Sequence, residues 1–254
     1  MSAAQQLRLI TIPISHYCEK ARWALDRAGI AYREEPHVQG VHRVASRRAG
    51  GVGTVPVLVT GDGAIGDSAE ILAWVDERIP QERRLFSADT TQRRAQEELC
   101  ARFDEQLGPP GRRLIYVRMF AEDRALTLEF NNQGVPAWED VAARRGWPAL
   151  QLGVSRALGI HPGVEVADEA TVWRELDHAA SLLADGRPYL LGDRFGAEDL
   201  TFAALCAPVL LPTDYGVVLP QPELLDAATA DLVRRAREHP AGRFAMEVTA
   251  KHRR

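Results

Sequence analysis

Near the start of the chain, a strand pattern, a helix pattern and a second strand pattern follow one another, and this order constrains the fold more than any other stretch. Residues 7–12 are apolar and rich in β-branched side chains, which predicts a strand, and Pro13 prevents its ladder from continuing. Apolar residues then recur at helical spacing up to Gly29, and residues 30–36 alternate as a half-exposed strand does. A right-handed crossover places both strands parallel, so the segment predicts a βαβ unit.

The start of this first helix carries a hydroxyl and a thiol, at Ser15 and Cys18. The first turn of a helix offers unpaired N–H groups and a positive dipole end, which would stabilise a thiolate or another anion there. A serine in this place is more often a helix cap, and a helical cysteine is as often packed in a core. From these residues alone, the structural and the chemical interpretations both stay open.

A second informative stretch surrounds Pro56. Residues 57–60 are an apolar strand, residues 61–63 a turn signal, and residues 64–65 the start of a returning strand. A proline directly before a buried strand favours a fixed, cis Val55–Pro56 bond. That bond would turn the backbone of Val55 outward, where an extended peptide can pair with it as an added strand.

Asp67 and Ser68 precede a third helical pattern over residues 69–78. They are typical of a helix N-cap. The same group of carboxylate, hydroxyl and free N–H groups can also hold both ends of an α-amino acid.

The composition excludes several other classes of protein. A formal net charge of −4 gives no reason to expect nucleic acid as a partner. Three scattered cysteines do not make a disulfide framework, and the first residues show no signal pattern, so we expect a cytoplasmic protein. No apolar run has transmembrane length, and no metal-site spacing is present, so we expect no membrane span and no metal.

After Pro80, a polar linker over residues 81–91 leads into a helical region. The predicted division is 1–80, 81–91 and 92–254. Prolines in the helical region fall mostly at predicted boundaries, where a missing N–H costs little. The candidate helices cover residues 92–107, 109–120, 121–131, 138–158, 168–184, 197–209, 223–237 and 241 to the end.

Taken together, the early motifs resemble a known family. Ser-x-x-Cys at the first helix, Val-Pro before the third strand and Asp-Ser before the third helix follow the order βαβαββα. This is similar to the thioredoxin-like N-terminal domain of glutathione S-transferases. The resemblance implies an α/β thioredoxin-like domain followed by an all-α domain. It also implies that Asp199, three residues after Gly196 in the sequence, completes the capping box of a buried helix.

The resemblance implies roles for single residues. Ser15 would donate a hydrogen bond to the sulfur of glutathione, the expected co-substrate, and favour its thiolate. The remaining expected contacts run along the tripeptide: Val55 and cis Pro56 at the cysteinyl backbone, Asp67 and Ser68 at the γ-glutamyl end, and His42 or Arg43 at the glycyl carboxylate.

By the same resemblance, a pocket for an electrophile lies between the two domains. Tyr116, Met119 and Phe120 are candidates to line it, and Arg112 or Arg113 is placed to meet an anionic substrate. A stripe of aromatic residues and methionine at helical spacing is otherwise typical of a core.

Three functions follow as hypotheses. The first is a serine-type glutathione transferase that attacks a small hydrophobic electrophile, in a role such as detoxification. The second is a non-catalytic binding or assembly module of this fold, and the third a glutathione-dependent thiol oxidoreductase that uses Cys18. Members of the family are usually dimers, so the resemblance implies a homodimer.

Overall fold

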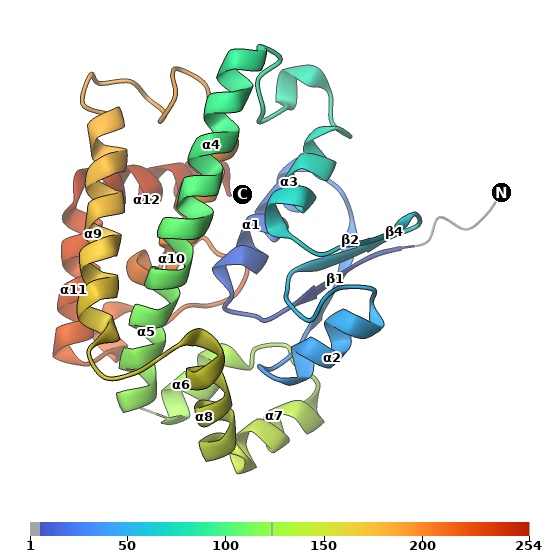
Figure 1. The fold of residues 1–254 in the computed structure, drawn as a ribbon, viewed down its shortest axis with the longest axis vertical. Helices are drawn as coiled ribbons and strands as arrows, with labels where there is room; N and C mark the ends of the chain where they lie inside the picture. The colour runs from blue at the N-terminus through green and yellow to red at the C-terminus, as the bar shows by residue number, and fades with distance from the viewer. Residues whose placement is uncertain (1–5, 123, 254) are drawn as a thin grey trace.

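The computed structural model describes residues 6–122 and 124–253. A four-stranded mixed sheet with its helices is followed by a helical part (Figure 1). The strand order is β2-β1-β3-β4, in which β1 pairs parallel with β2, and β3 pairs antiparallel with β1 and β4. The predicted βαβαββα order is therefore confirmed. Its elements are β1 (Leu7–Thr11), α1 (His16–Ala28), β2 (Tyr32–Pro36), α2 (Val41–Arg48), β3 (Val57–Thr60), β4 (Gly63–Ile65) and α3 (Ser68–Asp76).

Local sequence signals set the ends of these elements. Ser15 caps α1, and Gly29 ends it in the left-handed conformation with φ of 69°, which suits a residue without a Cβ atom. The Val55–Pro56 bond directly before β3 is cis, as predicted. Asp67 caps α3 with its side chain. The first sheet thus presents the start of α1 and the start of β3 on a common side of the fold.

The helical part begins with a 3-10 turn and continues to the end of the described chain. Asp89 caps its first long helix, which starts slightly before the predicted residue 92. The boundaries at residues 80 and 91 stay a prediction. The elements are a 3-10 turn (Gln81–Arg83), α4 (Thr90–Gln106), α5 (Gly108–Glu122), α6 (Arg124–Asn131), α7 (Ala137–Arg145), α8 (Trp147–Leu158), α9 (Val164–Leu182), α10 (Ala197–Leu210), a second 3-10 turn (Pro222–Leu224), α11 (Ala227–Glu238) and α12 (Pro240–His252).

The single helix predicted over residues 138–158 is wrong. The chain forms α7 and α8 there, with Gly146 between them. Pro148 lies in the first turn of α8. Because proline has no N–H to donate and collides with the preceding turn, it can begin a helix but cannot continue one. The start of α11 also differs from the prediction, since Asp226 caps it at Ala227.

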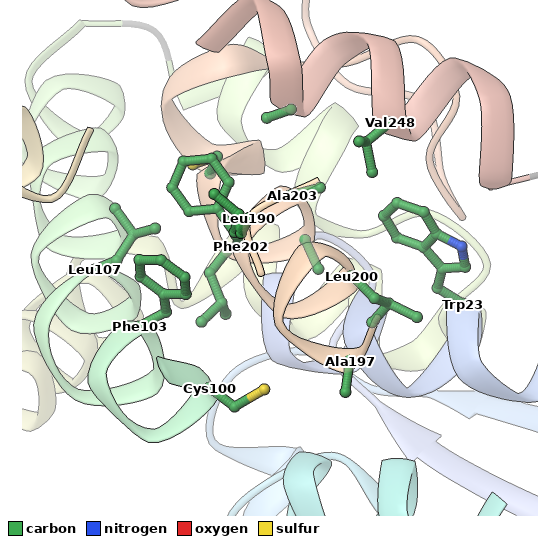
Figure 2. Packing of buried hydrophobic residues seen from close by; sticks show 14 of the residues in the cluster. Trp23, Cys100, Phe103, Leu107, Leu190, Ala197, Leu200, Phe202, Ala203 and Val248 are labelled. Carbon is green, nitrogen blue, oxygen red and sulfur yellow. The ribbon is translucent and has the colours of Figure 1, made fainter. Parts of the chain in front are cut away.

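α10 lies at the centre of the main core, and all its residues except Pro208 are buried. Figure 2 shows Trp23 of α1 on one side of α10 and Phe103 of α4 on the other. The rings of Phe103 and Phe202 lie 4.9 Å apart, centroid to centroid. The predicted cap partner Asp199 accepts hydrogen bonds from the Gly196 N–H (2.8 Å) and the Leu190 N–H (2.9 Å), which holds the start of this helix.

Charged side chains of α1 are buried and joined to other parts of the chain. Lys20 is fully buried and binds the Asp104 carboxylate of α4 at 2.7 and 2.9 Å. Arg22 lies between Glu19 at 3.3 Å and Glu34 of β2 at 2.7 Å. Both faces of α1 beyond its first turn are thereby fixed.

The end of the described chain returns to α1. Arg253 pairs with Glu19 and with Asp26, and the indole N–H of Trp23 donates to the His252 carbonyl at 2.9 Å. Within residues 6–122 and 124–253, no helix combines the length and apolar character needed to cross a membrane.

Candidate functional site

A cavity of about 570 Å³ lies where the first turn of α1 and the loop before β3 meet the helical part. α5, α8 and the chain from the end of α10 to the start of α11 form its other sides. This volume is typical of a small-molecule site. The cavity brings together seven of the predicted site residues: Ser15, His42, Arg43, Val55, Arg112, Tyr116 and Met119. The others lie outside its lining: Cys18, Pro56, Asp67, Ser68, Arg113 and Phe120.

Ser15 is both the cap of α1 and part of the cavity wall. Its Oγ accepts a hydrogen bond from the Cys18 N–H at 3.4 Å. A hydroxyl can accept and donate at once, so the cap does not use the hydrogen of the Ser15 hydroxyl, which can still donate to an anion in the cavity. The structural and chemical interpretations of Ser15 are compatible.

Cys18 belongs to the core. Its exposed fraction is 0%, and burial raises the pKa of its thiol although Arg22 acts in the opposite direction. The thiolate is the nucleophilic form of cysteine, so this surrounding disfavours a reactive thiol.

Val55 offers a free edge to the cavity. In the part of the chain that the structure describes, its N–H and C=O have no hydrogen-bond partner. The neighbouring Gly53 N–H is held by the Ser46 hydroxyl at 3.0 Å, which fixes the loop. An extended peptide can therefore add beside Val55.

Asp67 lies at the start of α3. Its Oδ1 accepts from the Ala69 and Glu70 N–H groups at 2.7 and 3.4 Å. Asp67 is exposed and Ser68 is buried. Burial raises the pKa of Tyr17, and the Asp67 charge contributes in the same direction, so the carboxylate lies within electrostatic reach of the start of α1.

His42 and Arg43 differ in charge. The His42 Nδ1 accepts from the Gly40 N–H at 3.1 Å, and burial lowers the pKa of His42 to about 4. His42 is therefore neutral at neutral pH, whereas Arg43 is exposed and charged. Arg43 is the better partner for a carboxylate at this edge.

The loop before α2 is held by residues that the sequence analysis missed. Glu139 of α7 is fully buried and accepts from the Val38 N–H at 3.0 Å, with His37 Nδ1 at 2.7 Å. The Gln39 amide donates to the Tyr116 hydroxyl at 2.7 Å and accepts from the Asn131 amide at 2.8 Å. These partners are far apart in the sequence, and no local pattern marks them.

The structure separates the two candidate arginines of α5. Arg113 forms a two-pronged ion pair with Asp168, at 2.8 and 2.5 Å. Arg112 lines the cavity, with its guanidinium carbon 6.0 Å from the Tyr17 ring centroid. Among residues 6–122 and 124–253, the buried Arg112 Nε has no hydrogen-bond partner.

Tyr116 and Met119 line the cavity, but Phe120 does not. Its ring lies edge-on to Trp147 at 5.5 Å, in a small second core formed by α6–α8 and the loop before α2. Phe120 is therefore a core residue, which is the usual role of aromatic residues at helical spacing.

An apolar wall completes the cavity and was also missed from sequence. It includes Leu150, Val154 and Leu158 of α8, with Leu211, Leu219 and Leu225 from the chain between α10 and α11. Among the described residues, no three or more His, Cys, Asp or Glu side chains gather as they would around a metal ion.

Comparisons with known proteins agree with the fold described above. Residues 9–83 match the model of the glutathione S-transferase N-terminal domain. No curated protein matches the sequence.

Solved structures resemble the chain over nearly its whole length. A glutathione S-transferase from Xanthobacter autotrophicus superposes with a TM-score of 0.63 at 17% identity, covering 96% of this chain and 93% of that one. One from Methylobacterium radiotolerans, in complex with glutathione sulfonate, gives 0.52 at 20% identity and 95% of each chain. A β-etherase from a Sphingobium species gives 0.58 at 17% identity, over 96% of this chain and 99% of its own.

Proposed function

Because residues 9–83 form a glutathione S-transferase N-terminal domain and the whole chain has the fold of that family, we propose that the protein is a glutathione transferase. In this proposal Ser15 activates the thiol of glutathione for attack on a small hydrophobic electrophile. The observation that carries it is the meeting of a free serine hydroxyl, a helix N-terminus and an unpaired strand edge in one cavity.

Each part of glutathione has a matching group. Its cysteinyl backbone pairs with the free N–H and C=O of Val55, and its ammonium group faces the Asp67 carboxylate. Arg43 meets the glycyl carboxylate. The sulfur then lies by Ser15, whose hydrogen bond to the charged form lowers the thiol pKa.

The reaction needs only these groups and an electrophile. The thiolate sulfur forms a bond to the electrophilic carbon. In a substitution the electron pair of the broken bond leaves with the leaving group, and in an addition the C=C electron pair goes to the neighbouring carbon, which takes up a proton from water. The apolar wall of the cavity favours a hydrophobic electrophile. By family likeness we also propose a cytoplasmic homodimer with a role such as detoxification; light scattering that gives the monomer mass would contradict the dimer.

The burial of Cys18 argues against the thiol oxidoreductase. A transferase that uses Ser15 keeps its activity in Cys18→Ala, whereas an oxidoreductase that uses Cys18 loses it and forms a mixed disulfide with glutathione, detectable by mass.

The test begins with calorimetric titration of the wild type with glutathione. Asp67→Asn removes the charge and keeps a good cap, so its effect reports on binding and not on the helix. We expect weaker binding in Asp67→Asn and unchanged binding in Asp62→Ala, which removes an exposed carboxylate from the turn before β4.

Ser15→Gly then tests the chemistry, because glycine caps a helix nearly as well as serine but has no hydroxyl. With 1-chloro-2,4-dinitrobenzene as electrophile, we expect kcat to fall by about 10²-fold, as for removal of one donor to a reacting anion. A folded wild type that binds no glutathione would favour the non-catalytic module.

A further inference from the structure

Arg112 places a positive charge in the cavity without a negative partner. Among the described residues it forms no ion pair, and its Nε is buried with no acceptor. Its neighbour Arg113 is matched by Asp168, and Lys20 on the facing helix is matched by Asp104. A buried polar group without a partner is costly, so an unmatched arginine in a cavity points to an anion that is not part of the protein.

Arg112 lines the same cavity as Ser15 and His16, and its guanidinium carbon lies 6.0 Å from the ring centroid of Tyr17 in the first turn of α1. Burial and, next, the Arg112 charge lower the pKa of His16, the residue after Ser15. His16 therefore stays neutral, and Arg112 supplies the charge beside the first turn of α1. An anion held by Arg112 lies close to the sulfur that Ser15 would bind.

Much of the remaining cavity lining is apolar. It includes Leu150, Val154 and Leu158 of α8, together with Leu219 and Leu225 from the chain between α10 and α11. Gly153 of α8 also lines the cavity, and a Cβ atom at this position would meet no heavy atom within 4 Å. The cavity therefore has room beside α8 for an extended hydrophobic group.

We propose that the electrophile is an elongated hydrophobic carboxylate, held by Arg112 at the carboxylate next to its reacting carbon and by α8 along its apolar body. This inference rests on the transferase activity proposed above. A 4-oxo-2-enoate with an aryl or alkyl group on the ketone has this form.

The addition to such a compound balances without another reactant. The thiolate sulfur forms a bond to the carbon that carries the carboxylate, the C=C electron pair moves toward the ketone, and water supplies a proton to the neighbouring carbon. No group leaves and nothing is oxidised.

The main experiment compares β-benzoylacrylate with its methyl ester, which has the same shape without the charge. The measured quantity is the ratio of kcat/KM for the acid to kcat/KM for the ester. A hydrogen bond to a charged group contributes a factor of about 10 to 100, so Arg112→Met lowers the ratio by about that much. Arg112→Lys restores part of it, and Arg156→Met, which removes an exposed charge from α8, leaves it at the wild-type value.

A different result would overturn the proposal. If Arg112→Met slows the acid and the ester equally, Arg112 acts on the glutathione sulfur and not on the electrophile. The proposal is also overturned if the wild type does not prefer the acid over the ester.

A binding measurement separates this inference from the proposed function. Calorimetric titration with β-benzoylpropionate, the saturated analogue that cannot react, needs neither glutathione nor turnover. Binding that is lost in the methyl ester and in Arg112→Met supports the anion site even if the protein fails to bind glutathione. Glutathione binding without any preference for the carboxylate supports the transferase and overturns the anion site.

Gly153→Leu tests the space beside α8, with Gly153→Ala as its control. The leucine side chain enters open space, so we expect kcat/KM for the biphenyl analogue of β-benzoylacrylate to fall more than for the parent acid. Equal effects on both compounds would contradict a substrate body that runs along α8.

Discussion

The start of α1, at Ser15 and His16, and the stretch from Glu19 to Arg22 carry similar polar residues in different surroundings. Glu19, Lys20 and Arg22 are almost fully buried, and each has a partner of opposite charge. The Nε2 of His16 is buried without a hydrogen-bond partner in the part of the chain that the structure describes, and the Ser15 hydroxyl can still donate. Burial is therefore not what distinguishes the two regions.

The two regions differ in where the partner of each buried polar side chain comes from. The side chains from Glu19 to Arg22 are paired by the chain itself, through α4, β2 and the residues after α12. Ser15 and His16 line the cavity, where Arg112 also has no partner of opposite charge among the described residues. A buried polar group that the chain leaves unpaired marks a place for a ligand, whereas one that the chain pairs holds the fold.

The largest expected effect comes from breaking the paired region. Arg22→Met leaves Glu34 without its buried cation and leaves Glu19 with Arg253 alone, and removal of one partner of a buried pair costs about 3–5 kcal/mol. Urea unfolding measures the loss. Arg33→Met, whose side chain is 63% exposed in its pair with Glu35, is expected to cost at most about 1 kcal/mol. Similar losses in both variants would remove the distinction.

The next effect is the pH dependence of the unpaired region. Burial and Arg112 lower the pKa of His16 below its ordinary value of 6.5, so the unfolded chain binds the proton more readily than the folded one. The stability from neutral His16 is present above pH 6.5 and is lost as the pH falls below it, by up to about 1.4 kcal/mol per pH unit. The difference between the wild type and His16→Gln, from urea unfolding at several pH values, isolates this residue from His42 and His252. A constant difference would contradict the prediction.

A smaller effect separates the two roles of Ser15. Ser15→Ala is expected to lower the free energy of unfolding by about 1 kcal/mol through loss of the cap, and Ser15→Gly by only a few tenths. Both variants lack the hydroxyl, so both lose turnover. If turnover followed stability instead, Ser15 would be a cap alone.

The smallest expected effect concerns Cys18, which lies near the junction of the two regions but packs with the paired one. We expect Cys18→Ala to keep the wild-type turnover. A thiol reagent is expected to label Cys18 only when the chain unfolds, followed by mass spectrometry across a urea series. Rapid labelling of Cys18 in the folded protein would show that its thiol is accessible and would contradict the prediction.

The sequence predicted what depends on neighbouring residues. The strand–helix–strand order, the cap at Ser15, the cis Pro56 and the cap at Asp67 all arise from signals within a few positions. Ser15 and Val55 were predicted from such local motifs, and both line the cavity.

The sequence could not predict what depends on contacts across the fold. Glu139 reaches the loop before α2 over a separation of 101 residues, and the apolar wall joins α8 to the chain beyond α10. Phe120 and Arg113 satisfied the same helical spacing as Met119 and Arg112, and only the three-dimensional packing shows which of them face the cavity.

The pairing of Glu19 with Arg253 also determines when the contacts of α1 can be completed during protein synthesis. The two residues are 234 positions apart, so at about 5–20 residues per second the ribosome delivers the arginine roughly 10–50 s after the glutamate. During that interval α1 has been synthesised with Glu19, but its partner Arg253 has not yet been made. The N-terminal sheet can form early, yet its contacts with the helical part stay incomplete until translation has passed Arg253, and this incomplete form is the one that a chaperone would meet.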